Sequence, residues 1–182
     1  MNPKTIATLA SYELRASLRN RWFALYALAF TVLAVALSSL SLSGAGMFGF
    51  AGFGRTAASL INLVLLIVPL MGLTIGAQSL AGEREQGTLA YLLAQPVSRV
   101  EVLLGKLVGL GGALLAALLL GFGLSAAVIA WQGGAVEAGR YGALVVLSLM
   151  LALATLSLGI FISAWSRSGA LAVGLALFAW LL

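Results

Sequence analysis

Apolar and polar positions alternate in long blocks along this chain. Four apolar runs, at 22–42, 56–80, 107–131 and 141–165, reach the length of about 20 residues that an α-helix needs to cross a bilayer. A fifth apolar run occupies 169–182, where the sequence stops. The pattern predicts an all-α, polytopic membrane protein with four complete spans and a truncated fifth, from a chain that continues further.

Residues 1–21 follow a different pattern. Apolar side chains recur there at helical spacing, while Lys4, Arg15 and Arg19 fall on the opposite face. This pattern predicts an amphipathic helix that lies along the membrane surface with its basic face toward anionic head groups. Glu13 interrupts the apolar face, either as a solvated charge at its edge or as one half of a salt bridge to a partner.

The segment 82–106, GEREQGTLAYLLAQPVSRVEVLLGK, is the long polar interruption between the second and third spans. It holds three of the five acidic residues and three of the ten basic residues. A charged side chain at bilayer depth costs about 2.5 to 3.5 kcal/mol on insertion scales, so this segment belongs in water or at the interface. It therefore predicts a protruding element on one side of the membrane.

Two helices are predicted within this segment. Leucines at helical spacing favour a short amphipathic helix from about Glu83 to Ala94, which ends before Pro96 because the residue preceding a proline is driven out of the α region. Ser98 and Glu101 then form the S-x-x-E pattern of a capping box, which predicts the start of the helix that enters the membrane.

Composition excludes several classes of function. The chain is 62% hydrophobic and 8% charged, far from the roughly 25% charged residues of soluble domains, and it contains no cysteine and no histidine. Gly105 and Lys106 do not belong to a phosphate-binding loop, since Val100 and Leu107 stand where that pattern requires Gly and Ser or Thr. We expect no catalytic, cofactor-binding or metal-binding residues in this chain.

The basic residues predict the orientation. Those of the amino-terminal segment, the polar segment and the turn near 167 are Lys4, Arg15, Arg19, Arg21, Arg84, Arg99, Lys106 and Arg167. The alternate loops hold only Arg55 and Arg140. Because positive charge accumulates on the cytoplasmic side, we expect the amino terminus and segment 82–106 to be cytoplasmic. The basic residues flank apolar runs, so we expect no nucleic-acid binding.

The segment 82–106, together with the amphipathic lead and the Arg-Asn-Arg-Trp entry to the first span, resembles the permease subunits of ABC-2 type ABC transporters. Within that family it resembles the branch that serves nitrous oxide reductase maturation. The resemblance implies a six-helix, non-catalytic subunit of the bacterial inner membrane that forms the substrate path and dimerises. It also implies cytoplasmic ABC ATPase partners, which bind ATP and Mg²⁺, and a periplasmic accessory protein.

The resemblance assigns roles to particular residues. A coupling helix at about 83–94 would contact the ATPase, and 1–21, with Glu13, Arg15 and Arg19, would be an interfacial connecting helix. The expected ATPase-coupling residues, with Gly82 and Pro96 setting the geometry, are Gly82, Glu83, Glu85, Gly87, Thr88, Leu89, Leu92 and Pro96.

Two other functions stay open. A membrane assembly scaffold would bind a soluble partner without transport, and a secondary transporter fragment would need intramembrane ionisable groups or internal repeats. A membrane enzyme is disfavoured because Glu83 and Glu85, two residues apart, fall on different sides of a helix. The substrate classes that the family handles, from drugs and lipids to polysaccharides and sulfur or copper species, are not separated by the sequence.

Overall fold

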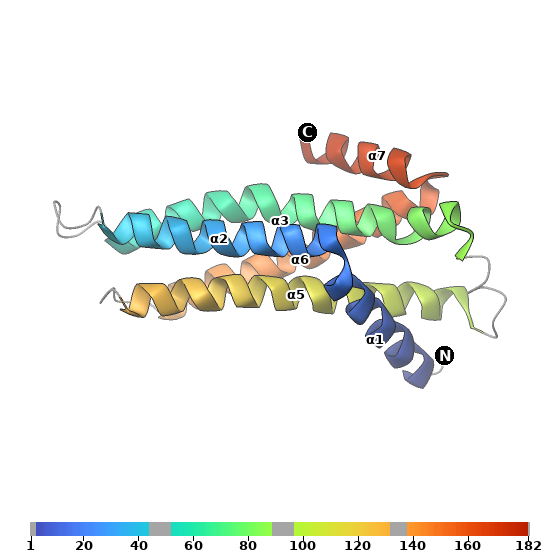
Figure 1. The fold of residues 1–182 in the computed structure, drawn as a ribbon, viewed down its shortest axis with the longest axis horizontal. Coiled ribbons are helices and arrows are strands. Elements are labelled where there is room, and N and C mark those ends of the chain that lie inside the picture. The colour runs from blue at the N-terminus through green and yellow to red at the C-terminus, as the bar shows by residue number, and fades with distance from the viewer. Residues whose placement is uncertain (1–2, 44–51, 89–96, 132–137, 182) are drawn as a thin grey trace.

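The computed structural model describes residues 3–43, 52–88, 97–131 and 138–181, and these residues are almost entirely helical (Figure 1). Helices α2, α3, α5 and α6 run side by side, and the shorter α1 and α7 are inclined to them (Figure 1). The elements are α1 (Pro3–Arg19), α2 (Arg21–Ser43), α3 (Gly52–Glu85), α5 (Arg99–Trp131), α6 (Ala138–Trp165) and α7 (Gly169–Leu181). The predicted all-α fold class is confirmed.

Four helices in the described part of the chain are long and apolar enough to cross a membrane: Arg21–Leu40, Ala58–Glu85, Arg99–Trp131 and Gly139–Trp165. Their outward-facing leucines, valines and phenylalanines are exposed, as expected of surfaces that contact lipid. The apolar helix α7 is shorter, with 13 residues. The chain is therefore a multi-pass membrane protein.

Helices α3 and α5 are longer than a bilayer requires. They contain 34 and 33 residues, which corresponds to a length of about 50 Å at 1.5 Å per residue, against a hydrocarbon thickness of about 30 Å. Each must therefore project beyond the hydrocarbon core. The carboxyl end of α3, the start of α5 and the α6–α7 turn lie at the same end of the bundle (Figure 1). We call this the polar end, because Glu83–Glu85 and Arg99–Lys106 lie there.

The extensive contact between α3 and α6 depends on glycine. A Cβ atom on Gly76 would lie 2.6 Å from the carbonyl oxygen of Leu156, and one on Gly159 would lie 2.6 Å from that of Leu73. Small residues allow such close backbone approach, which is a common way for membrane helices to associate. This crossing sits beside the main core, whose most buried members include Phe30, Leu60, Val68, Met71, Leu114, Leu118 and Leu156.

Buried polar contacts hold the other half of the bundle together. The hydroxyl groups of Ser38 in α2 and Ser125 in α5 lie 2.6 Å apart, and Tyr141 Oη in α6 donates to the carbonyl of Phe122 in α5 at 2.6 Å. The Phe122 ring also packs edge-on against Phe30 and Tyr141. These contacts fix α5 between α2 and α6.

Asn20 separates α1 from the first membrane-spanning helix, α2. Its side-chain oxygen accepts a hydrogen bond from the backbone N–H of Trp22 at 2.9 Å, and its carbonyl accepts one from Ala24 at 2.9 Å. This is N-cap geometry, so Asn20 ends one helix and starts the next. The chain changes direction between α1 and α2 (Figure 1).

Candidate functional site at the polar end of the bundle

Lys106 joins three helices at the polar end. Its ammonium group lies 2.6 Å from Glu13 Oε1 of α1 and 2.6 Å from Glu83 Oε1 of α3, while Lys106 itself belongs to α5. The lysine side chain is 1% exposed, against 14% for Glu13 and 29% for Glu83. A lysine this deeply buried requires such partners, because an unpaired ammonium group loses its hydration on burial. Glu13 is thus paired within the chain itself.

Helix α1 reaches Lys106 because it packs closely on α5. A Cβ on Gly105 would lie 2.6 Å from Leu9 Cβ, and one on Gly109 would lie 2.5 Å from the Ala10 carbonyl oxygen. The small residues that begin the third span therefore contact the amino-terminal helix. Ala10 and Ser17 are buried on the packed face of α1, and Glu13 lies between them in sequence. The acidic residue that interrupts the apolar pattern of α1 is the one that bonds to α5.

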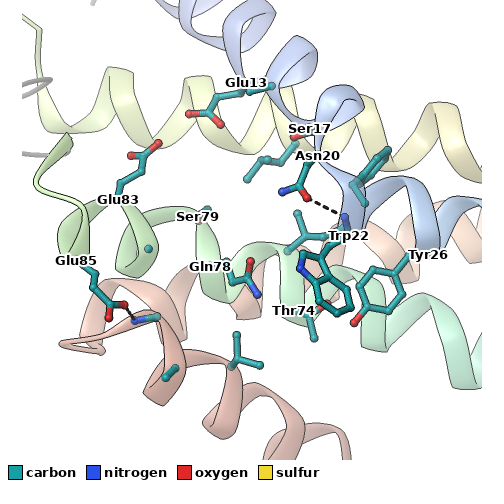
Figure 2. Close-up of a pocket in the computed structure, with 18 of the residues that line it drawn as sticks. Glu13, Ser17, Asn20, Trp22, Tyr26, Thr74, Gln78, Ser79, Glu83 and Glu85 are labelled. Carbon is teal, nitrogen blue, oxygen red and sulfur yellow. Dashed lines mark hydrogen bonds between the residues drawn. The ribbon is translucent and has the colours of Figure 1, made fainter.

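Arg84 and Glu85 connect the end of α3 to the α6–α7 turn. The Arg84 guanidinium donates to the carbonyl of Ser166 at 2.6 Å and to that of Ala164 at 3.4 Å. Glu85 Oε2 accepts a hydrogen bond from the backbone N–H of Gly169 at 3.0 Å (Figure 2). The positive charge of Arg84 thus lies at the carboxyl end of α6, and the negative charge of Glu85 lies at the amino end of α7. The helix dipoles favour both placements.

The end of α3 lies further along the chain than the sequence predicted. We expected a short helix to begin at about Glu83, but Glu83–Glu85 form the last residues of α3. Gly87, at φ 75°, adopts the left-handed conformation typical of the residue after a helix, and its N–H donates to the Arg84 carbonyl at 3.2 Å. Thr88 Oγ1 also donates to the Glu83 carbonyl at 3.2 Å. Glu83–Glu85 therefore belong to α3, where tertiary partners satisfy their side chains. The chain is helical again at Thr88, and the rest of the predicted coupling helix, 89–94, lies outside the described residues.

The predicted capping box at the start of α5 is present. The backbone N–H of Glu101 donates to Ser98 Oγ at 3.2 Å, and the backbone N–H of Ser98 donates to Glu101 Oε2 at 2.9 Å. Each residue thus satisfies a donor of the first turn that has no partner inside the helix. Within segment 82–106, Gly87 thus follows the end of α3, and Ser98 marks the start of α5.

A cavity of about 900 Å³ opens beside this cluster, between α1, α2, α3 and α7. Figure 2 shows Gln78 and Thr74 from α3, Trp22 and Tyr26 from α2, and the carboxyl groups of Glu13 and Glu83 around it. Gln78, a polar residue within the second predicted span, lines the cavity. The arrangement combines hydrogen-bonding groups and aromatic rings at the polar end.

The structure places most of the predicted site residues. Glu13, Glu83 and Glu85 have partners within the chain, and Arg15 and Arg19 are exposed on α1. Gly87 lies in the turn after α3, and Thr88 donates to the Glu83 carbonyl. A Cβ on Gly82 would meet nothing within 4 Å, so packing among the described residues does not require glycine there. The rest lie outside the described residues: Leu89, Leu92 and Pro96.

Sequence reasoning missed Lys106 as the centre of this cluster. It counted the lysine as a topology signal and as part of a rejected phosphate-loop pattern. The sequence feature that could have indicated a partner for Lys106 is its position beside the small residues Gly105 and Gly109, in an otherwise apolar helix. An ionisable residue in such a place usually has a specific partner.

The fold and the polar end define a class, the multi-pass α-helical membrane proteins with charged contacts gathered at one end of the bundle. The chain belongs to the ABC-2 transporter family, since a sequence model of that family, described as "ABC-2 family transporter protein", matches residues 7–182. Two relatives are each called "Probable ABC transporter permease protein NosY". The one from Stutzerimonas stutzeri is 38% identical over 178 residues, which is 96% of this chain and 64% of the relative.

The second relative, from Pseudomonas aeruginosa, is 37% identical over 177 residues, 95% of this chain and 64% of the relative. This chain thus spans 64% of the length of each relative, slightly less than two thirds. The resemblance seen in segment 82–106 is confirmed at the level of the family, and both relatives carry the name of the branch that it indicated.

Proposed function

We propose that this chain is the membrane-spanning part of a permease subunit in an ATP-driven ABC transporter of the bacterial inner membrane. It forms the substrate path as a homodimer, with its amino terminus in the cytoplasm, and it does not itself hydrolyse ATP. Cytoplasmic ABC ATPase subunits bind ATP and Mg²⁺ and supply the drive. The observation that carries this proposal is the family match over residues 7–182. The names of both relatives support the NosY branch. We propose nitrous oxide reductase maturation, with a periplasmic accessory protein, as its setting.

The arrangement of the polar end supports a coupling role for segment 82–106. Moving a two-state membrane domain from 1:99 to 99:1 requires about 5.5 kcal/mol of differential interaction. A partner that displaces the segment after Gly87 would act directly on the end of α3. That end is bonded through Glu83 to α5, through Arg84 to α6 and through Glu85 to α7. Force applied at one short segment is therefore distributed to the other helices.

Co-purification tests this proposal. The full-length permease and the ATPase encoded beside it are expressed together and isolated through a tag on the permease. We expect the ATPase to co-purify, and Leu92→Asp to lower its yield at least about tenfold, because the loss of a buried hot-spot side chain costs about 2 kcal/mol or more. Val100→Asp is the matched control, since Val100 is an exposed apolar residue of the same polar segment outside the predicted contact set. A permease that retains no ATPase in mild detergent contradicts the proposal and favours a scaffold.

Glu83→Gln and Glu85→Gln test the acidic residues separately. Both carboxylates have partners inside the chain, so we expect both variants to insert and to retain the ATPase. Coupling between ATP binding and movement of the membrane domain should weaken. Unchanged coupling in both variants would remove these residues from the proposed role.

A further inference from the structure

We propose that Lys106 is a positioning residue that holds α1 and the carboxyl end of α3 together as one moving unit. This inference rests on the proposed coupling function and adds to it a residue on α5 that segment 82–106 alone does not reveal. The Lys106 ammonium group contacts one carboxylate from each helix at 2.6 Å. Glu13 of α1 and Glu83 of α3 share this one partner on α5. The lysine therefore connects α1 to α3.

The burial of this cluster gives the connection its strength. An exposed ion pair contributes little stability, because water screens both charges. Here the lysine is 1% exposed, and removing one member of a buried pair leaves the other charge without compensation. Loss of Lys106 would leave Glu13 and Glu83 facing each other as like charges. The two helix ends should then separate.

The two halves of the cluster are not equivalent. Glu13 is 14% exposed and is held by the close packing of α1 on Gly105 and Gly109. Glu83 is 29% exposed and lies four residues before Gly87, where α3 ends. Water can replace Lys106 more easily at Glu83 than at Glu13. Glu83 is therefore the contact that yields first when the segment beyond α3 is pulled.

The α1–α5 contact has a second support, and this makes the lysine testable. Leu9 and Ala10 pack on Gly105 and Gly109 without any charged group. Replacing Lys106 should therefore release the end of α3 while α1 stays on α5 and the bundle stays folded. A purely structural lysine would instead lower the stability of the whole protein.

Spin labels measure this separation in the full-length permease bound to its ATPase in lipid nanodiscs. The 182 residues contain no cysteine, so Arg15→Cys and Gln86→Cys place labels on exposed positions of α1 and of the turn after α3. In the wild-type background we expect the distance between the two labels of one protomer to form a narrow distribution. With Lys106→Met it should become at least about twofold broader, and Lys106→Arg should restore it because the charge is retained. Arg99→Met, at an exposed basic residue of the same helix, is the control and should leave the distribution narrow.

A second label pair reports transmission to the opposite end of the bundle. Leu40→Cys and Gly139→Cys lie near the ends of α2 and α6 that are distant from the polar end. ATP binding should shift their distance in the wild-type complex, and Lys106→Met should lower the shifted fraction about tenfold, within the range of typical coupling energies.

The outcomes separate this inference from the proposed function. A narrow Arg15–Gln86 distribution in Lys106→Met overturns the role of Lys106, whatever the ATPase does. A wild-type complex that shows no ATP-dependent shift contradicts the proposed function, while the first label pair still tests the connection. A Lys106→Met protein that melts as a whole, with Lys106→Arg equally affected, identifies a structural lysine and also overturns the inference.

Discussion

The hydroxyl group of Ser163, in α6, bonds to the backbone of α3 at Ala81. Ser163 Oγ accepts a hydrogen bond from the Ala81 N–H at 2.8 Å and donates one to the Ala77 carbonyl at 2.6 Å. It also accepts from the Leu80 N–H at 3.0 Å. In a regular α-helix the Ala81 N–H would donate to Ala77, so this serine links two groups that otherwise pair with each other. The link lies just before the charged residues at the end of α3.

We expect Ser163→Ala to destabilise the protein by about 1 kcal/mol, the scale of interhelical hydrogen bonds in membrane proteins. Ser157→Ala is the matched control, because Ser157 is an exposed serine of the same helix whose hydroxyl donates to its own Leu153 carbonyl at 2.8 Å. Thermal unfolding in detergent, followed by tryptophan fluorescence, compares the two variants. Equal melting temperatures would mean that the α3 contact adds no stability.

The crossing of α3 and α6 should not tolerate a methyl group. Gly76→Ala would place a Cβ 2.6 Å from the Leu156 carbonyl oxygen and 2.8 Å from the Ile160 nitrogen. These are backbone atoms that cannot move independently of α6, and overpacking of this kind costs about 1 to 3 kcal/mol. The expected result is a lower melting temperature and a lower yield of monodisperse protein.

Gly123→Ala is the control for that substitution, since a Cβ on Gly123 meets nothing within 4 Å. Alanine is a better helix former than glycine by about 1 kcal/mol, so this variant should be neutral or stabilising. A Gly76→Ala protein as stable as Gly123→Ala would disprove the close crossing.

The capping box predicts a local effect at the start of α5. Ser98→Ala removes the acceptor of the Glu101 N–H, and loss of an N-cap typically costs about 1 kcal/mol. Hydrogen exchange of the amides in the first turn should then become about fivefold faster. Ser98→Asp retains an acceptor oxygen and should keep the protection. Exchange that is unchanged in Ser98→Ala would show that the cap is not formed in solution.

The proposed orientation predicts which side a membrane-impermeant thiol reagent can reach. In intact cells, the cysteine introduced by Gln86→Cys should remain unlabelled until the membrane is permeabilised, because the polar end faces the cytoplasm. Gly139→Cys, an exposed position at the opposite end of the bundle, should be labelled from outside without permeabilisation. The reverse pattern would place segment 82–106 outside the cytoplasm and exclude an ATPase contact.

Local patterns in the sequence determined much of this protein. Apolar runs of sufficient length predicted the spans, because a bilayer imposes a minimum length on any helix that crosses it. Ser98 and Glu101 predicted the start of α5 correctly, since a capping box depends on residues three positions apart. The family was recognisable from the order of residues in segment 82–106.

Only the tertiary structure decided what the charged residues bind. Lys106 is 93 positions from Glu13 and 23 from Glu83, so no local pattern pairs them. For the same reason the sequence could not show that α3 continues through Glu83–Glu85, where partners on α5, α6 and α7 bind these side chains. A charge can be placed on the correct side of a membrane from sequence, but its partner depends on how distant helices pack.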